Sequence, residues 1–256
     1  MSESRRGDLF QRALRALQGG IPGRKAELWD SKHPGDNWLS DRAEWLVKSL
    51  GVSKYLRPKI EFDSTDRTKV VSGVTVVDVG AGKGHIMDEI DQQLPGSHVI
   101  GVDPHDDQTA IVRKRGEQLG NNIEYLDETQ HAESMSRVEG GSVDGIVMSF
   151  VLHHLNEHER TRALREAIRV LKPDGYVFIA EDVAENEQER QMAEAYDRIL
   201  NADATDNSAH TYLSLEEWKN LFIGAGLDIV ESNIKKPGKV THGFFVLKKR
   251  VEEGAH

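Results

Sequence analysis

The chain has 256 residues, 38% of them hydrophobic and 30% charged, which is enough apolar material for a globular core. Its net charge of -10 disfavours a polymeric nucleic acid as a partner, because binding to a phosphate backbone usually requires a basic surface. There is no cysteine, no signal-peptide pattern and no apolar stretch near the roughly 20 residues of a membrane span, so we expect a cytoplasmic protein without disulfides or thiolate metal ligands.

The first 73 residues differ in character from the rest of the chain. "DLFQRALRALQ" and "DRAEWLVKSLGV" have the spacing of amphipathic helices, and Trp29, Trp38 and Trp45 lie near them. Residues 1–73 are therefore predicted to form a helical N-terminal cap, with residues 58–73 as a polar surface connection. The tryptophans either pack inside this cap or stack on a substrate, and Trp38 is the candidate for the second role.

From residue 74 to residue 250, short apolar runs alternate with helical patterns, which is typical of a parallel α/β sheet. The runs predicted as strands are 74–80, 97–103, 122–126, 142–150 and 175–182. The helices predicted between them are 84–94, 106–119, 131–138 and 157–171.

The pattern changes after the fifth strand. Residues 186–202 and 214–227 are predicted helices, and Ser214 with Glu217 forms a capping-box pattern at the start of the second one. Two further strands follow at 227–234 and 241–249. Because no crossover helix fits between them, we expect an antiparallel hairpin and seven strands in total.

The stretch "VVDVGAGKGH", residues 76–85, is a glycine-rich turn directly after the first of these strands. A phosphate-binding loop needs a serine or threonine after the lysine, but Lys83 precedes a glycine. In a dinucleotide turn that starts at Gly80, the third glycine would fall where His85 stands. Asp78 would also repel a pyrophosphate, so both interpretations fail.

A carboxylate at this position suits a cofactor that is positively charged there. S-adenosylmethionine carries a sulfonium and an α-ammonium group and no phosphate, and glycines let the backbone approach it closely. The series Asp78, Gly80, Gly82 and Gly84 resembles motif I of the class I S-adenosylmethionine-dependent methyltransferases. Asp103, at the end of the second strand, stands where an acid accepts hydrogen bonds from ribose hydroxyls in such folds.

The flanking segments "SVDGIVMSFVLHHL" and "VLKPDGYVFIAED" resemble the next motifs of the small-molecule branch of that family. The resemblance covers residues 74–249 and implies an α/β, Rossmann-like sheet of seven strands, with helices on both faces and an antiparallel C-terminal hairpin. It implies a cofactor site made of Asp78, Gly80, Gly82, Gly84, Asp103, Pro104 and Ser149. The usual Gly-Asp pair after the third strand is missing, so Asp127, Glu128 or Thr129 is expected to contact the adenine, unless the two acids are solvated loop residues.

Acceptor residues are expected at the carboxyl ends of the strands, where such sheets bind ligands. The predicted catalytic residues are His154, Glu181 and His210. The predicted substrate-binding residues are His153, Asp182, Tyr212, His242 and Trp38. Packing of the histidines and an N-cap role for Asp182 are the structural alternatives.

A metal site made of Glu181, Asp182, His210 and His242 is an alternative, but no pair has the close histidine spacing of a zinc motif, so no metal is expected. We therefore predict methyl transfer from S-adenosylmethionine to a small-molecule acceptor by a monomer or homodimer. The alternatives are a cofactor-binding scaffold without turnover, a dinucleotide oxidoreductase, and another reaction of the same cofactor on this fold.

Overall fold

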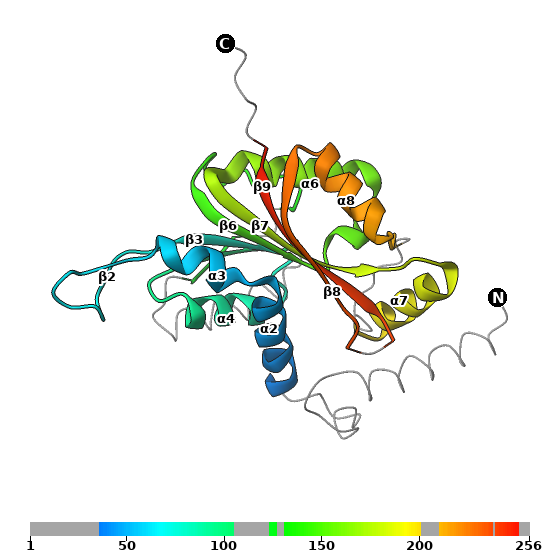
Figure 1. Cartoon of the computed structure of the whole chain (residues 1–256), viewed down its shortest axis with the longest axis horizontal. Coiled ribbons are helices and arrows are strands. Elements are labelled where there is room, and N and C mark those ends of the chain that lie inside the picture. Colours follow the sequence, from blue (N-terminus) through cyan, green and yellow to red (C-terminus); the bar gives the residue numbers. More distant parts are fainter. Residues whose placement is uncertain (1–35, 105–122, 127–130, 201–209, 238, 251–256) are drawn as a thin grey trace, which may run out of the picture.

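A mixed seven-stranded sheet runs through the centre of the molecule (Figure 1). The computed structural model describes residues 36–104, 123–126, 131–200, 210–237 and 239–250. The strands of the sheet are β3 (Thr75–Val79), β4 (His98–Val102), β5 (Ile123–Tyr125), β6 (Val143–Ser149), β7 (Leu171–Val183), β8 (Leu227–Lys235) and β9 (Thr241–Lys249). Their order is β5-β4-β3-β6-β7-β9-β8, and β9 is antiparallel to both of its neighbours. The predicted seven-stranded sheet and C-terminal hairpin are confirmed.

Helices cover both faces of this sheet (Figure 1). They are α2 (Asp36–Leu50), α3 (Val52–Leu56), α4 (His85–Gln93), α6 (Glu157–Val170), α7 (Glu187–Leu200) and α8 (Leu215–Gly224), with short 3-10 turns η2 (Arg57–Lys59) and η3 (Leu152–His154). The predicted helices at 106–119 and 8–18 lie outside the described residues, whereas the helix predicted at 41–52 corresponds to α2. In the described part of the chain, no helix is both long and apolar enough to cross a bilayer.

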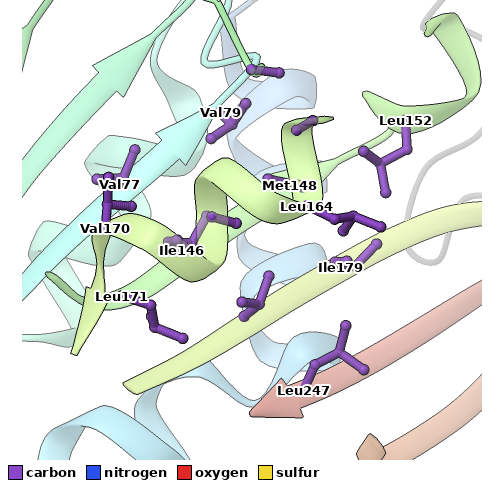
Figure 2. Close-up of a cluster of buried hydrophobic side chains, with 14 of the residues drawn as sticks. Val77, Val79, Ile146, Met148, Leu152, Leu164, Val170, Leu171, Ile179 and Leu247 are labelled. Carbon is purple, nitrogen blue, oxygen red and sulfur yellow. The ribbon is translucent and has the colours of Figure 1, made fainter. Parts of the chain in front are cut away.

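Two hydrophobic cores lie on opposite faces of the sheet because side chains alternate along each strand. On one face, which we call the α6 face, α6 and α8 pack against residues such as Val77, Met148 and Ile179 (Figure 2). On the other, the α2 face, α2, α3 and α4 pack against residues such as Val76 and Phe178. This alternation decides on which face each polar side chain of the strand ends lies.

Local sequence signals account for the starts of two helices. Asn156 and Ser214 each form a capping box at the start of α6 and α8, as predicted for Ser214. β7 begins at Leu171, before the predicted start at residue 175, with an irregular register opposite β6. The predicted surface connection at 58–73 contains a small antiparallel pair, β1 (Glu61–Phe62) and β2 (Val70–Ser72).

The predicted helix at 131–138 is wrong, because this segment consists of turns. Its buried residues, Ala132, Met135 and Val138, recur every third position and so imitate a helical period. Local turn hydrogen bonds and side chains of α6 instead satisfy its backbone. Glu166 accepts a hydrogen bond from the Met135 N–H at 2.8 Å, and Arg169 donates to the carbonyls of Met135 and Val138 at 2.9 and 3.0 Å.

Candidate cofactor and acceptor site

The glycine-rich turn follows β3 and leads into α4. Gly80 and Gly82 have φ angles of +73° and +49°, which side chains other than glycine rarely adopt. A Cβ atom on Gly80 would lie 2.4 Å from Cγ2 of Val151, so the absence of a side chain at Gly80 lets Val151 pack closely against the turn. A Cβ on Gly82 would meet no atom of the described residues within 4 Å. The backbone at Gly82 therefore borders open space at the carboxyl edge of the sheet.

Asp78 lies at the base of this turn and is almost completely buried, with 1% of its surface exposed. Among the described residues, its Oδ2 atom has no hydrogen-bond partner. Burial, together with the negative charge of Asp103, raises the pKa of the Asp78 carboxyl well above its ordinary value. A buried carboxyl without a partner is costly, and a positively charged ligand would relieve that cost.

Asp103 follows β4 and holds the turn in place. Its Oδ2 atom accepts a hydrogen bond from the Gly82 N–H at 2.9 Å. The Tyr125 hydroxyl donates to the Gly82 carbonyl at 3.0 Å, so both backbone polar groups of Gly82 are held by neighbouring side chains. Pro104 is exposed next to Asp103. Asp127 and Glu128, predicted to contact the adenine, lie outside the described residues.

The end of β6 adjoins the turn. The Ser149 hydroxyl is buried and has no hydrogen-bond partner in the described part of the chain. Phe150 has a φ angle of +58°, which is uncommon for a residue with a side chain, and its N–H donates to the Ala180 carbonyl at 2.8 Å. Such backbone strain is often found at functional sites, where the surrounding structure enforces it.

Glu181 and Asp182 are neighbours on β7, and their side chains point to opposite faces of the sheet. Asp182 shares the α2 face with Ala180 and Phe178, and Glu181 shares the α6 face with Ile179 and Val183. By the same alternation, Asp78 and Ser149 point to the α2 face. The sheet therefore separates the predicted acceptor residues into two groups.

On the α2 face, Asp182 is paired with His242. The two residues are opposite each other in the β7–β9 register, and Nδ1 of His242 lies 2.6 Å from Oδ1 of Asp182. The rings of Trp45 and Phe150 meet His242 edge-on, with centroids at 5.9 and 5.2 Å. This is a histidine oriented by a carboxylate, an arrangement used for general-base catalysis. Trp38 lies in α2, outside the described side chains.

On the α6 face, Glu181 orients His153. The Glu181 carboxylate is fully buried, and its Oε1 atom accepts hydrogen bonds from the backbone N–H groups of Val151 and Leu152 at 3.0 and 2.6 Å. Its Oε2 atom lies 2.7 Å from Nδ1 of His153. Glu181 is thus engaged on both oxygen atoms by the segment after β6.

Three histidines surround Asp197 of α7 in what we call the histidine cluster, which consists of His153, His154, Asp197 and His210. Tyr212 stacks on His153 with ring centroids at 5.3 Å. Burial opposes protonation of His153, but the charge of Glu181 and a hydrogen bond with Asp197 raise its pKa to about 10. Burial also works against ionisation of Asp197, yet His153 and the other histidines lower the pKa of its carboxyl.

The structure thus groups most of the predicted site residues. The cofactor candidates Asp78, Gly80, Gly82, Asp103 and Ser149 converge on the turn. The acceptor candidates divide into the Asp182–His242 pair and the group around His153. Sequence reasoning missed Asp197, because an acidic residue in the amphipathic helix at 186–202 carries no signal of the histidines that it faces. It also missed Phe150, whose backbone strain no residue pattern indicates.

The strand order and the glycine turn with its buried aspartate define an α/β protein of the doubly wound kind, with a candidate ligand site at the carboxyl ends of β3, β4 and β6. The sequence model of the methyltransferase domain family matches residues 36–232. The chain therefore belongs to the methyltransferase domain family, and the predicted class of S-adenosylmethionine-dependent methyltransferase is confirmed.

Relatives of known name agree with this class. The chain is 28% identical to a phosphoethanolamine N-methyltransferase of Triticum aestivum over 56% of its length, but it spans only 29% of that protein. It is 26% identical to an uncharacterized methyltransferase of Staphylococcus carnosus over 62% of its length and 73% of the relative's. A ubiquinone biosynthesis O-methyltransferase of Hahella chejuensis is 25% identical over 47% of this chain and 48% of the relative.

Solved structures share the fold at low sequence identity. The 1,6-didemethyltoxoflavin-N1-methyltransferase of Burkholderia thailandensis, solved with its substrate and S-adenosylhomocysteine, superposes with a TM-score of 0.58 at 14% identity, covering 98% of this chain and 92% of the other. An S-adenosylmethionine-dependent methyltransferase of Aquifex aeolicus has a TM-score of 0.55 at 21% identity, covering 93% and 97%. The [4+2]-cyclase SpnF has the same fold with a TM-score of 0.56 at 15% identity, covering 79% and 82%. This fold therefore occurs with more than one kind of chemistry.

Proposed function

We propose that this protein transfers the methyl group of S-adenosylmethionine to a small-molecule acceptor. The observation that carries the proposal is the buried Asp78 carboxyl at the end of β3, whose Oδ2 atom lacks a partner among the described residues. An anionic ligand such as a dinucleotide pyrophosphate would increase the free-energy cost of burying the Asp78 carboxylate, whereas the ammonium group of S-adenosylmethionine would reduce that cost.

The other residues of the turn fit the same ligand. The backbone at Gly82 borders open space, so the amino-acid part of the cofactor can pass close to it. Asp103 uses Oδ2 to hold Gly82, and a carboxylate accepts several hydrogen bonds, so it can also accept from the ribose hydroxyls. We assign the buried Ser149 hydroxyl to the same ligand. The contacts of Asp127 and Glu128 with the adenine remain predictions.

We place the acceptor on the α2 face, because Asp182 and His242 share that face with Asp78. The bound cofactor supplies an electrophilic methyl group on a sulfonium. The chain aligns the acceptor for in-line displacement and excludes water from the acceptor and the methyl group. Asp182 accepts a hydrogen bond from the Nδ1–H group of His242 at 2.6 Å, which leaves Nε2 to take the acceptor's proton as the new bond forms.

The names of the relatives support a small acceptor, since they include enzymes of phosphoethanolamine, ubiquinone and demethylmenaquinone metabolism. We assign the proton acceptor to His242, which the sequence predicts as a substrate-binding residue, in place of the predicted catalytic residues His154, Glu181 and His210. Glu181 is fully buried, and both of its oxygen atoms are engaged by residues 151–153. We therefore assign it to positioning His153.

Calorimetry with S-adenosylmethionine, S-adenosylhomocysteine and NAD, each added separately, tests the cofactor. We expect the first two to bind with micromolar affinity and NAD not to bind. Radiolabelled S-adenosylmethionine, incubated with the protein and fractionated small-molecule extracts, then tests transfer, and a labelled product identifies the acceptor. Binding of NAD in place of S-adenosylmethionine would refute the proposal, whereas tight S-adenosylmethionine binding without any labelled product would favour a binding protein.

His242→Gln tests the acceptor side. We expect the maximal rate of methyl transfer to fall at least 100-fold for an acceptor that must lose a proton, because general-base catalysis contributes about 10²–10⁴-fold. Cofactor affinity should stay unchanged, since His242 is paired with Asp182 and not with the turn. His158→Gln, an exposed histidine in the first turn of α6, is the matched control. An unchanged rate in His242→Gln would move the proton acceptor elsewhere.

A further inference from the structure

We propose that His153, His154, Asp197 and His210 bind a divalent first-row transition-metal ion of the Zn²⁺ type. The site is distinct from the glycine turn and from the Asp182–His242 pair. It would give the protein a metal centre in addition to its cofactor. The inference does not depend on the proposed methyl acceptor.

The geometry of the histidine cluster is the first argument. Its four potential ligand atoms all lie within 4.8 Å of one another. Ring nitrogens approach the Asp197 carboxylate at 2.8 Å from His210, 3.4 Å from His153 and 3.7 Å from His154. Ligand atoms about 2.0–2.1 Å from a tetrahedral Zn²⁺ ion are roughly 3.3 Å apart. The cluster therefore needs only small side-chain adjustments to enclose one ion.

The second argument is the support behind His153. Histidines that bind a metal commonly donate their other ring N–H to a carboxylate, which sets the tautomer and orients the ring. Glu181 stands in that position, 2.7 Å from Nδ1 of His153, and is itself held by two backbone N–H groups. Nε2 of His153 is then the atom that faces Asp197, at 3.4 Å.

The donor set indicates which ions fit. Three imidazoles and one carboxylate suit Zn²⁺, Fe²⁺, Co²⁺ or Ni²⁺, whereas Mg²⁺ and Ca²⁺ prefer sites made only of oxygen atoms. Side chains of His153, Asp197 and His210 are less than 10% exposed, and that of His154 is 28% exposed. The ion would thus be enclosed by protein, with His154 nearest to solvent.

The cluster joins parts of the chain that are far apart in sequence. His153 is 44 residues from Asp197, and His154 is 56 residues from His210. An ion would connect the segment after β6, helix α7 and the segment before α8. This separation explains why the spacing of histidines along the chain did not predict a metal site.

The test uses the full chain without a histidine tag, after removal of metals with a chelator. Zn²⁺, Co²⁺ and Mg²⁺ are titrated separately by calorimetry, and the visible absorption of bound Co²⁺ reports the coordination geometry. We expect one equivalent of Zn²⁺ per chain with a Kd below about 1 μM, no comparable Mg²⁺ binding, and a Tm that rises with Zn²⁺ concentration.

Asp197→Asn and His210→Gln should each weaken Zn²⁺ binding at least tenfold, and Glu181→Gln by about 10- to 100-fold. The exposed His158→Gln is the matched control and should bind Zn²⁺ like the unaltered chain. Circular dichroism checks that each variant is folded.

Failure of the unaltered chain to bind any of the transition-metal ions stoichiometrically would overturn the proposal, whatever the variants do. Stoichiometric binding that persists at full affinity in folded Asp197→Asn and His210→Gln would also overturn it. Because the readouts are metal content, spectrum and Tm, they are independent of methyl transfer. A failure here would leave the proposed function standing, and the reverse also holds.

Discussion

Asp78 and Asp197 are both buried aspartates near the carboxyl ends of the central strands, but their surroundings are opposite. Asp78 has no partner for Oδ2 in the described part of the chain, and its pKa is raised by burial and by Asp103. Asp197 is also buried, yet three histidines face it and lower the pKa of its carboxyl. The chain itself places three histidines around Asp197, whereas no described residue pairs with Oδ2 of Asp78, and we propose that a ligand does so.

Replacing each aspartate separately by asparagine tests this difference between their surroundings. In metal-free protein, Asp197→Asn should destabilise the fold by about 3 kcal/mol, because it removes the negative charge that faces His153 in a buried site. In a chain of this size that corresponds to a fall in Tm of roughly 6–12 °C. Thermal unfolding in the presence of a chelator measures it. An unchanged Tm would show that the histidines are neutral and that Asp197 stabilises nothing by its charge.

Asp78→Asn should have the opposite effect on stability and a large effect on binding. Loss of the carboxylate should weaken S-adenosylmethionine binding at least 100-fold, or about 2.7 kcal/mol, while the Tm of the ligand-free protein rises. Calorimetry and thermal unfolding measure the two changes.

Asp144→Asn is the control for that comparison. Asp144 is also buried, but it lies near the start of β6, where it accepts hydrogen bonds from the Thr75 N–H at 3.0 Å and from Lys172 at 2.8 Å. Its replacement should lower the Tm and leave cofactor affinity unchanged. A lower Tm in Asp78→Asn as well would contradict the idea that the buried Asp78 carboxyl destabilises the ligand-free protein.

The turn around Asp78 could be predicted from the sequence, but the histidine cluster around Asp197 could not. The turn at residues 76–85 is local, so its glycines and Asp78 could be interpreted from spacing alone. The histidine cluster depends on α7, and no residue pattern shows that Asp197 faces His153. Glu181 and Asp182 could not be assigned to different faces either, because that requires knowing which face of β7 each neighbouring helix covers.

The same limit applies to the fold. The strands at residues 74–80 and 142–150 are apolar runs bounded by glycine or polar turns, so their type and approximate ends were predictable. The segment 131–138 was not, because its buried residues repeat with a helical period while side chains of α6 satisfy its backbone. Turn hydrogen bonds and tertiary hydrogen bonds to α6 take the place of helical ones, which a pattern of apolar residues does not reveal.

Asp103→Ala should weaken S-adenosylmethionine binding at least tenfold, or about 1.4 kcal/mol. The substitution removes the expected acceptor for the ribose hydroxyls and also the hydrogen bond to Gly82, so part of the loss reflects the turn itself. Asp103→Asn separates the two contributions, since an amide oxygen still accepts from Gly82. Unchanged affinity in folded Asp103→Ala would overturn the ribose assignment.

The smallest expected effect concerns the pH dependence of stability, which should differ between the unaltered protein and Asp78→Asn. In the unfolded chain Asp78 loses its proton near its ordinary pKa of 3.8, whereas burial and Asp103 keep it protonated to higher pH in the folded protein. The folded state then binds more protons than the unfolded state, so stability contributed by this group falls as pH rises. Below about pH 4 the protein and Asp78→Asn should be equally stable.

Above that pH the variant should become progressively more stable than the unaltered protein, until the folded Asp78 also ionises and the difference stops growing. Urea unfolding of both proteins between about pH 4 and pH 8 measures this difference, and other titrating groups cancel because both chains share them. Saturating S-adenosylmethionine should reduce the difference or reverse its sign, since the ammonium group then stabilises the ionised carboxylate of the unaltered protein. A difference that stays constant with pH, with or without the cofactor, would show that Asp78 is ionised in the folded protein over this whole range and already has a positive partner.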